Sequence, residues 1–315
     1  MMKIVSIIIP AKNEEKFLPL CLGSIQQLDY PKEAIEVIVV DNGSTDHTRE
    51  IALSFGAIVL RDDTKHVSGL RNLGAKEAKG EILTFLDADC TVAPDWLQAA
   101  ERYFYNNEVV AWGAPPGIPD GATWVQKAWY MIRKKEHEVQ NVDWLESMNL
   151  FVPKIKFSLV DGFNEELITC EDVDLSYRLS SQGKIVADAR ICVIHLGEAA
   201  TIAQFWRKEL WRGLGNFQGL RYHGVILKEL PSLMIPAYFS IMLLAGLILS
   251  LTISQLYSPL ILVSFFVPGA LVIASRYNRG NIFELIKLLP IIYCYFMART
   301  ASFYLFFLNF STKYK

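Results

Sequence analysis

Residues 82–86 form a short apolar run, Ile-Leu-Thr-Phe-Leu, which leads directly into two aspartates, Asp87 and Asp89. A run without polar alternation is typical of a strand buried on both faces of a sheet. The carboxyl ends of such strands line the crevice in which open α/β sheets bind ligands. Two carboxylates with no adjacent Lys or Arg are costly there unless a cation compensates them. Because hard divalent cations share oxygen ligands with phosphates, the stretch predicts a metal and diphosphate site, with a solvated turn as the alternative.

Three further apolar runs precede this stretch and alternate with segments of helical periodicity. They lie at residues 5–9, 37–40 and 57–60. Strands that alternate with helices at this spacing predict an α/β fold with a mostly parallel sheet and right-handed crossovers. The four strands would then bring their polar loops to one edge of the sheet, namely residues 12–14, 41–46, 62–66 and 87–89.

Four ordered segments resemble the family-2 glycosyltransferases: residues 5–15, residues 39–46, Arg71-Asn72, and the Asp-Ala-Asp of residues 87–89. That family consists of inverting enzymes that use nucleotide sugars and have the GT-A fold, a single Rossmann-like domain. The resemblance runs through roughly the first two thirds of the chain. No G-x-G-x-x-G sequence follows a predicted strand, which counts against a dinucleotide-dependent oxidoreductase.

The resemblance implies a set of residues that hold the nucleotide sugar. Pro10, Glu14 and Asp41 match positions that contact the nucleoside, and Arg71 matches a position that contacts the phosphates or the base. A carboxylate such as Asp41 can accept the imide N–H of uracil, which favours a UDP-linked donor. From the residues alone, Asp41 could instead stabilise a turn, and Arg71 could be a solvated charge on a helix.

The resemblance also implies a divalent cation, Mg²⁺ or Mn²⁺, as cofactor. Asp89 is the expected direct ligand, and Asp87 is expected nearer the ribose or the sugar, with a contact to the metal also open to it. His195 follows two short predicted strands, residues 185–187 and 191–194, and is a further candidate for the metal or the phosphates. A purely structural role for this histidine is the alternative.

Residues 171–179, Glu-Asp-Val-Asp-Leu-Ser-Tyr-Arg-Leu, predict a helix whose first turn is acidic. A helix dipole favours such a first turn by itself. In the resembling family the Glu-Asp pair opens a helix that faces the acceptor, and the aspartate is the general base. The resemblance therefore implies Asp172 as the base, which takes the proton of the acceptor hydroxyl, and Glu171 as a contact to the acceptor or a phosphate.

A second helix is predicted at residues 201–222, with apolar and basic residues on largely different faces. A basic helix that contains Trp suits a membrane interface. Its Gln204, Trp206 and Arg207 resemble the Gln-x-x-Arg-Trp element of processive polysaccharide synthases, although Lys208 stands where that element has Trp. These three residues are expected to contact the acceptor or a phosphate.

The remainder of the chain is largely apolar. Residues 230–253 carry no charge and are long enough to span a bilayer, and residues 256–274 are a second candidate. Arg276, Arg279 and Lys287 follow the second candidate, so the positive-inside rule places both flanks in the cytoplasm. A third segment, residues 288–308, has Arg299 at its centre; it would either cross while packed against the other two or lie in the interface.

These features predict a glycosyltransferase domain at residues 1–228 and a C-terminal helical transmembrane region at residues 229–315. The positive-inside rule would place the catalytic domain of this multi-pass protein in the cytoplasm, and five scattered cysteines fit such a reducing compartment. The net charge of −2 gives no electrostatic case for nucleic acid as a partner.

The tail arrangement resembles that of bacterial exopolysaccharide glycosyltransferases that extend a lipid-linked saccharide. The expected activity is therefore transfer of a sugar to a lipid-linked or polysaccharide acceptor at the membrane. The expected donor is UDP-linked, because Asp41 suits uracil. Transfer to a polyprenyl phosphate and processive polysaccharide synthesis are alternatives within the same class. An inactive membrane protein that binds sugar nucleotides is the alternative from another class.

Overall fold

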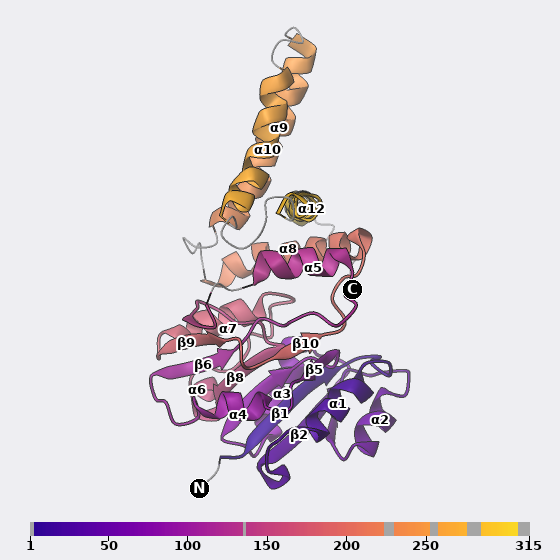
Figure 1. Ribbon diagram of the computed structural model, residues 1–315, viewed down its shortest axis with the longest axis vertical. Coiled ribbons are helices and arrows are strands. Elements are labelled where there is room, and N and C mark those ends of the chain that lie inside the picture. The colour runs from indigo at the N-terminus through magenta and orange to yellow at the C-terminus, as the bar shows by residue number, and fades with distance from the viewer. Residues whose placement is uncertain (1–2, 135–136, 224–229, 253–257, 276–284, 308–315) are drawn as a thin grey trace. The chain divides into compact units, whose positions relative to one another are not determined.

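The computed structural model describes residues 3–134, 137–223, 230–252, 258–275 and 285–307 (Figure 1). The chain forms two compact units. The first contains residues 1–121 and 134–198, and the second contains residues 122–133 and 199–315. The helix predicted at residues 201–222 belongs to the second unit, while the predicted boundary between residues 228 and 229 lies outside the described residues.

The first unit is built on four parallel strands in the order β3-β2-β1-β4. All four predicted strands are present, as β1 (Val5–Ala11), β2 (Ile35–Asp41), β3 (Ile58–Arg61) and β4 (Ile82–Leu86). They alternate with three helices, α1 (Leu18–Gln26), α2 (Thr48–Ser54) and α3 (Val67–Glu77), and a short 3₁₀ turn η1 (Lys32–Ala34) lies before β2. The predicted α/β fold with its mostly parallel central sheet is confirmed.

In the part of the chain that the structure describes, the sheet continues beyond β4 with four more strands, of which only β9 (Lys184–Asp188), predicted at residues 185–187, was found from the sequence. β8 (Asn149–Pro153) pairs antiparallel with both β4 and β6 (Val109–Gly113). β9 and then β7 (Val139–Asn141) complete the eight-stranded sheet. Three helices accompany these strands: α4 (Trp96–Glu101), α6 (Lys154–Leu159) and α7 (Glu171–Ser180).

The apolar runs of the strands are buried because the sheet has a hydrophobic cluster on each face. Ile7 and Ile9 of β1 belong to one cluster, and Ile8 between them belongs to the other. Successive side chains of a strand point to opposite faces, so a strand covered on both sides must be apolar throughout. Trp112 stacks on Phe151 across β6 and β8 and fills the first cluster, with both rings fully buried.

A small second sheet places residues beside the end of β4. β5 (Cys90–Val92) follows the two aspartates directly and pairs antiparallel with β10 (Val193–His195). In this register His195 lies opposite Cys90. The pairing therefore brings the predicted histidine next to the Asp-Ala-Asp turn, although more than a hundred residues separate them in the sequence.

The second unit is helical. It contains α5 (Trp124–Arg133), α8 (Ile202–His223), α9 (Leu230–Thr252), α10 (Ser258–Ala274) and α12 (Leu289–Phe307). The three predicted apolar segments are therefore helices, and α9 and α10 run side by side (Figure 1). Among the described residues, no helix combines the length and the apolar character needed to cross a membrane. Arg276 and Arg279, on which the predicted topology depends, lie outside the described residues.

The central arginine of α12 has a partner on α8. Arg299 Nη2 lies 2.9 Å from Oε2 of Glu209, whose side chain is fully buried, and Arg212 Nη1 lies 2.6 Å from Oε1 of the same carboxylate. A buried charge is tolerated when it is paired in this way. The ion pair thus accounts for an arginine inside an otherwise apolar helix, because it packs α12 against α8.

Candidate active site

The first part of the site is a pair of side chains at the turn between β4 and β5. His195 Nε2 lies 3.0 Å from Asp89 Oδ2, and His195 Nδ1 lies 3.6 Å from Glu198 Oε2. Gly197 is required at its position, because a Cβ atom there would lie 1.9 Å from Asp89 Oδ2. A carboxylate that orients a ligating histidine from behind is the usual arrangement in metal sites. Glu198 was not predicted, although its spacing of three residues after His195 is a usable signal.

These side chains fit a divalent cation. Asp89, Cys90 and His195 each offer one ligand atom, and these atoms lie within 4.8 Å of one another. Burial raises the pKa of the Cys90 thiol well above its usual value, and the charges of Asp87 and Asp89 add to this effect. Cys90 is fully buried, and its soft sulfur is a poor match for a hard cation that prefers oxygen ligands. The remaining oxygen and imidazole donors suit a cation such as Mn²⁺.

Glu14 faces the same carboxylates from the loop after β1. Burial raises its pKa to about 7, and the nearby charges of Asp89, Asp87 and Asp46 contribute. Its backbone N–H donates to Thr48 Oγ1 at 2.7 Å, which ties this loop to the start of α2. A divalent cation bound beside Asp89 would lower the free-energy cost of keeping Glu14, Asp87 and Asp89 ionised at the same time.

Asp41 and Pro10 lie at the ends of neighbouring strands. Asp41 is buried, and its carboxylate accepts the backbone N–H of Ser44 at 3.1 Å. The turn after β2 also needs Gly43, which has a φ of 68°. In this structure Asp41 therefore stabilises the turn 41–44, and Pro10 is the partly buried residue of β1 paired with Val40.

Arg71 is buried, so it is not the solvated helix charge that was considered as an alternative. The side chain is 3% exposed and makes two ion pairs: Nη2 lies 2.7 Å from Asp87 Oδ1, and Nη1 lies 2.7 Å from Glu171 Oε1. Glu171 is buried by this contact. The guanidinium therefore joins the end of β4 to the start of α7.

Asp172 begins α7 immediately after Glu171. The pKa of its carboxyl group is raised to about 7 by burial and by the charges of Glu171 and Glu146, and the charge of Arg71 opposes this shift. Its Oδ1 accepts the backbone N–H of Val173 at 2.9 Å, which fixes the side chain. A carboxylate with a pKa near neutrality is suited to take a proton from a hydroxyl group. Glu146 was not identified from the sequence.

The three residues predicted on α8 lie in the second unit. Gln204 forms a capping box with Thr201: Gln204 Oε1 accepts the backbone N–H of Thr201 at 3.2 Å, and Thr201 Oγ1 accepts that of Gln204 at the same distance. Trp206 is partly buried, and Arg207 is exposed. The structure thus gives Gln204 a local role at the start of the helix.

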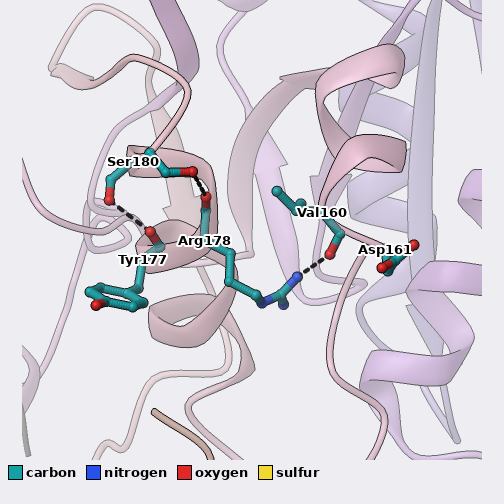
Figure 2. Close-up of a pocket in the computed structure, with 6 residues that line it drawn as sticks. Val160, Asp161, Tyr177, Arg178 and Ser180 are labelled. Atoms are coloured by element: carbon teal, nitrogen blue, oxygen red, sulfur yellow. Dashed lines mark hydrogen bonds between the residues drawn. The ribbon is translucent and has the colours of Figure 1, made fainter. Parts of the chain in front are cut away.

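A shallow pocket lies at the other end of α7 (Figure 2). Figure 2 shows Val160 and Asp161 on one side and Tyr177, Arg178 and Ser180 on the other, and Ser181 completes the lining. Arg178 is fully occupied there, because it bonds to Asp174 and to the carbonyl groups of Val160 and Gly162. At 1.5 Å per helical residue, Ser180 is about 12 Å along the axis from Asp172. This pocket is therefore separate from the carboxylate cluster.

The fold and the cluster together define an α/β protein in which carboxylates gather after β1, after β4 and at the start of α7. Residues 6–157 match the sequence family "Glycosyl transferase family 2". Glycosyltransferase AglE of Haloferax volcanii is 30% identical over 224 aligned residues, and the match covers 68% of this chain and 73% of that protein. The chain belongs to glycosyl transferase family 2, and it is a glycosyltransferase that uses a nucleotide-sugar donor.

More distant relatives extend the comparison. The beta-monoglucosyldiacylglycerol synthase of a Nostoc species is 28% identical over 244 residues, and the chain spans about half of that protein, 52%. Among solved structures, the mannosyltransferase PcManGT from Pyrobaculum calidifontis, in complex with GDP-Man and Mn²⁺, has a TM-score of 0.63 at 17% identity. That match covers 98% of this chain and 88% of the other, and at this identity it supports the GT-A fold alone.

Proposed function

We propose that the protein transfers a sugar, with inversion, from a UDP-linked donor to a lipid-linked saccharide at the cytoplasmic face of a membrane. The observation that carries the proposal is the convergence of four distant segments in one unit. Asp89 pairs with His195, and Arg71 connects Asp87 to the helix that begins with Glu171 and Asp172. This arrangement would supply a cation site for a diphosphate, at Asp89 and His195, and a base for an acceptor hydroxyl, Asp172, in the same unit.

Each part has a chemical task in this reaction. A divalent cation held by Asp89 and His195, with Asp87 close by, would stabilise the charge on the departing nucleoside diphosphate as a Lewis acid. Asp172 takes the proton of the attacking hydroxyl, and a pKa of about 7 lets it accept that proton near neutral pH. One displacement on the sugar inverts its configuration, so a second, nucleophilic carboxylate is not needed.

The choice of UDP is supported by chemistry around β2. Asp41 lies at the end of β2, and a carboxylate can accept the imide N–H of uracil. UDP-GlcNAc is bound by S. aureus TarS 1–349, whose structure has a TM-score of 0.51 with this chain at 18% identity. The PcManGT complex contains GDP-Man, so a GDP-linked donor is the alternative that must be tested beside the UDP-linked one.

The membrane location is supported by the surface of the helical unit. Met234, Ile241 and Leu244 of α9 are 59–64% exposed, and Val263 and Leu271 of α10 are 64–65% exposed. Large apolar side chains gathered on neighbouring helices favour contact with a lipid phase or another apolar surface. One relative is named for the synthesis of a glucosylated diacylglycerol, which is a membrane lipid. An enzyme held at the surface on which its acceptor lies would orient that acceptor at lower cost.

The test is a transfer and hydrolysis assay with the full chain purified in detergent. The donors are UDP-glucose, UDP-GlcNAc, UDP-galactose and GDP-mannose, each with Mn²⁺ or Mg²⁺ and with lipid extracts or polyprenyl phosphate as acceptor. We expect turnover of one UDP-sugar that EDTA abolishes and Mn²⁺ restores. Turnover of GDP-mannose and of no UDP-sugar would refute the proposed donor. Product formed only on polyprenyl phosphate would refute the proposed lipid-linked saccharide acceptor.

A further inference from the structure

The contacts of Arg71 suggest a task that differs from binding the donor. We propose that Arg71 is a positioning residue that fixes the helix carrying the base, Asp172, to the metal-binding end of β4, with Glu171 as its counter-ion. The inference deepens the proposed function and rests on it for the role of Asp172. It reassigns Arg71 and Glu171 from substrate contacts to the framework that sets the distance between the donor and the base.

The geometry leaves little of the guanidinium for a substrate. The side chain is 3% exposed, and its two terminal nitrogens are each 2.7 Å from a carboxylate oxygen, one on Asp87 and one on Glu171. Those two carboxylates are separated by more than eighty residues: Asp87 directly follows β4, and Glu171 begins α7. A planar guanidinium can hold two carboxylates at a fixed separation, whereas an ammonium group is a single point charge.

The neighbouring residues of α3 hold the same segment of chain. Asn72 Nδ2 donates to the carbonyl of Phe163 at 2.8 Å, and the backbone N–H of Phe163 donates to Asn72 Oδ1 at 2.9 Å. Lys65, just before the helix, lies 2.6 Å from Glu165. Arg71 itself lies over the ring of Phe163, 5.5 Å from its centroid. α3 thus binds the chain from residue 163 to residue 171 at several points, and Arg71 makes the last one before the base.

The end of that segment needs an external support because its backbone is unfavourable. Cys170, the residue that precedes α7, has a φ of 63°, a left-handed conformation that is costly for a side chain with a Cβ atom. Its side chain makes no capping hydrogen bond to the first turn. The ion pair between Arg71 and Glu171 lies at the next residue and holds the first turn in place.

The charge of Arg71 also acts on the base. Glu171, Glu146 and Arg71 are the charged groups that shift the pKa of Asp172: the two glutamates raise it, and the arginine lowers it. Removing the arginine should therefore raise the pH at which Asp172 ionises, and removing the charge of Glu171 should lower it. A residue with a purely structural role would leave the pH profile where it is.

The experiment compares Arg71→Met, Arg71→Lys and Glu171→Gln with the wild-type chain. Because Arg71→Met leaves two carboxylates without their cation, the double variant Arg71→Met/Glu171→Gln is included to restore charge balance. Lys184→Met is the control, since Lys184 forms an exposed ion pair with Glu108. The readouts are the affinity for UDP with Mn²⁺ by calorimetry, kcat and donor KM, the pH profile, and amide hydrogen exchange over residues 163–175.

We expect kcat to fall about 100-fold in Arg71→Met and about 10-fold in Glu171→Gln. A misplacement of a catalytic group by about 1 Å is enough for a loss of this size. The affinity for UDP and Mn²⁺ should stay within about two-fold of wild type, Arg71→Lys should rescue only part of kcat, and exchange should rise over residues 163–175. The acidic limb of the pH profile should move up in Arg71→Met and down in Glu171→Gln.

Two results would overturn the inference. A rise in donor KM or a loss of UDP affinity with kcat preserved would make Arg71 a nucleotide contact. Unchanged hydrogen exchange over residues 163–175 in Arg71→Met would show that it does not hold this segment, and that readout needs no turnover. A wild-type chain that turns over no donor would instead refute the proposed function, and the exchange result would still decide the structural part.

Discussion

Replacing Asp172 by Asn should increase the stability of the protein while removing most of its activity. The carboxyl group has an ordinary pKa of 3.8, which burial and the charges of Glu171 and Glu146 raise to about 7 in the folded protein. Since one pKa unit corresponds to about 1.4 kcal/mol, ionised Asp172 costs the fold up to about 4 kcal/mol. Solvent reaches part of the side chain, so we expect a measurable gain of about 2 kcal/mol from the neutral amide.

The pH dependence of this gain follows from proton binding. Because the folded carboxyl has the higher pKa, the folded protein holds more protons than the unfolded chain between about pH 4 and pH 7. The wild type therefore loses stability as the pH rises through this window, and Asn does not. The variant should match the wild type near pH 4 and have a melting temperature higher by about 4–8 °C at pH 8.

The assay combines thermal unfolding at pH 4.5, 6 and 8 with turnover of the donor at pH 8. Loss of a general base should lower kcat by about 10²–10⁴-fold. Asp174→Asn is the control on the same turn: Asp174 is buried and accepts two hydrogen bonds from Arg178, so its substitution should lower the melting temperature and spare turnover. Turnover of Asp172→Asn within about three-fold of wild type would refute the base, and a lower melting temperature at pH 8 would refute the raised pKa.

Three other predictions concern the metal and the packing. Mn²⁺ at about 100 times its Kd should stabilise the wild type by about 2.7 kcal/mol, and Asp89→Asn should abolish the shift in thermal unfolding. Asn149→Leu should cost at least about 3 kcal/mol in urea unfolding, because buried Asn149 bonds to Trp96 Nε1 and to the carbonyls of residues 114 and 191. Gly213→Ala should lower the melting temperature, because the added Cβ would lie 2.1 Å from Ser302 Oγ. Gly23→Ala is the control and should not lower it, because nothing lies within 4 Å of a Cβ there. Equal changes in melting temperature for the two variants would contradict the packing of α8 on α12.

The sequence alone was informative wherever the signal is local. The strand ending at Leu86 and the three strands before it were found from largely apolar runs, because a strand buried on both faces lacks polar alternation. Strands 109–113 and 149–153 were not predicted. β8 lies between β4 and β6 and is antiparallel to both, and the hydrophobic pattern of a strand does not predict which strands it will pair with. The three apolar segments of the tail form helices, but the partner of Arg299 could not be foreseen.

The types of side chain at the candidate site were set by the sequence, and their connections by the tertiary structure. Asp89 and Asp172 were predicted from motifs, because each motif is a short stretch that can be recognised without a distant partner, and His195 was a candidate only from its place after two predicted strands. Only the folded chain shows that Arg71 bonds to Glu171, one hundred residues away, rather than pointing to solvent. The physical reason is that a buried charge must be paired with an opposite charge. Which residue becomes its partner depends on the segments that the fold brings beside α3, and the residues next to Arg71 in the sequence do not specify it.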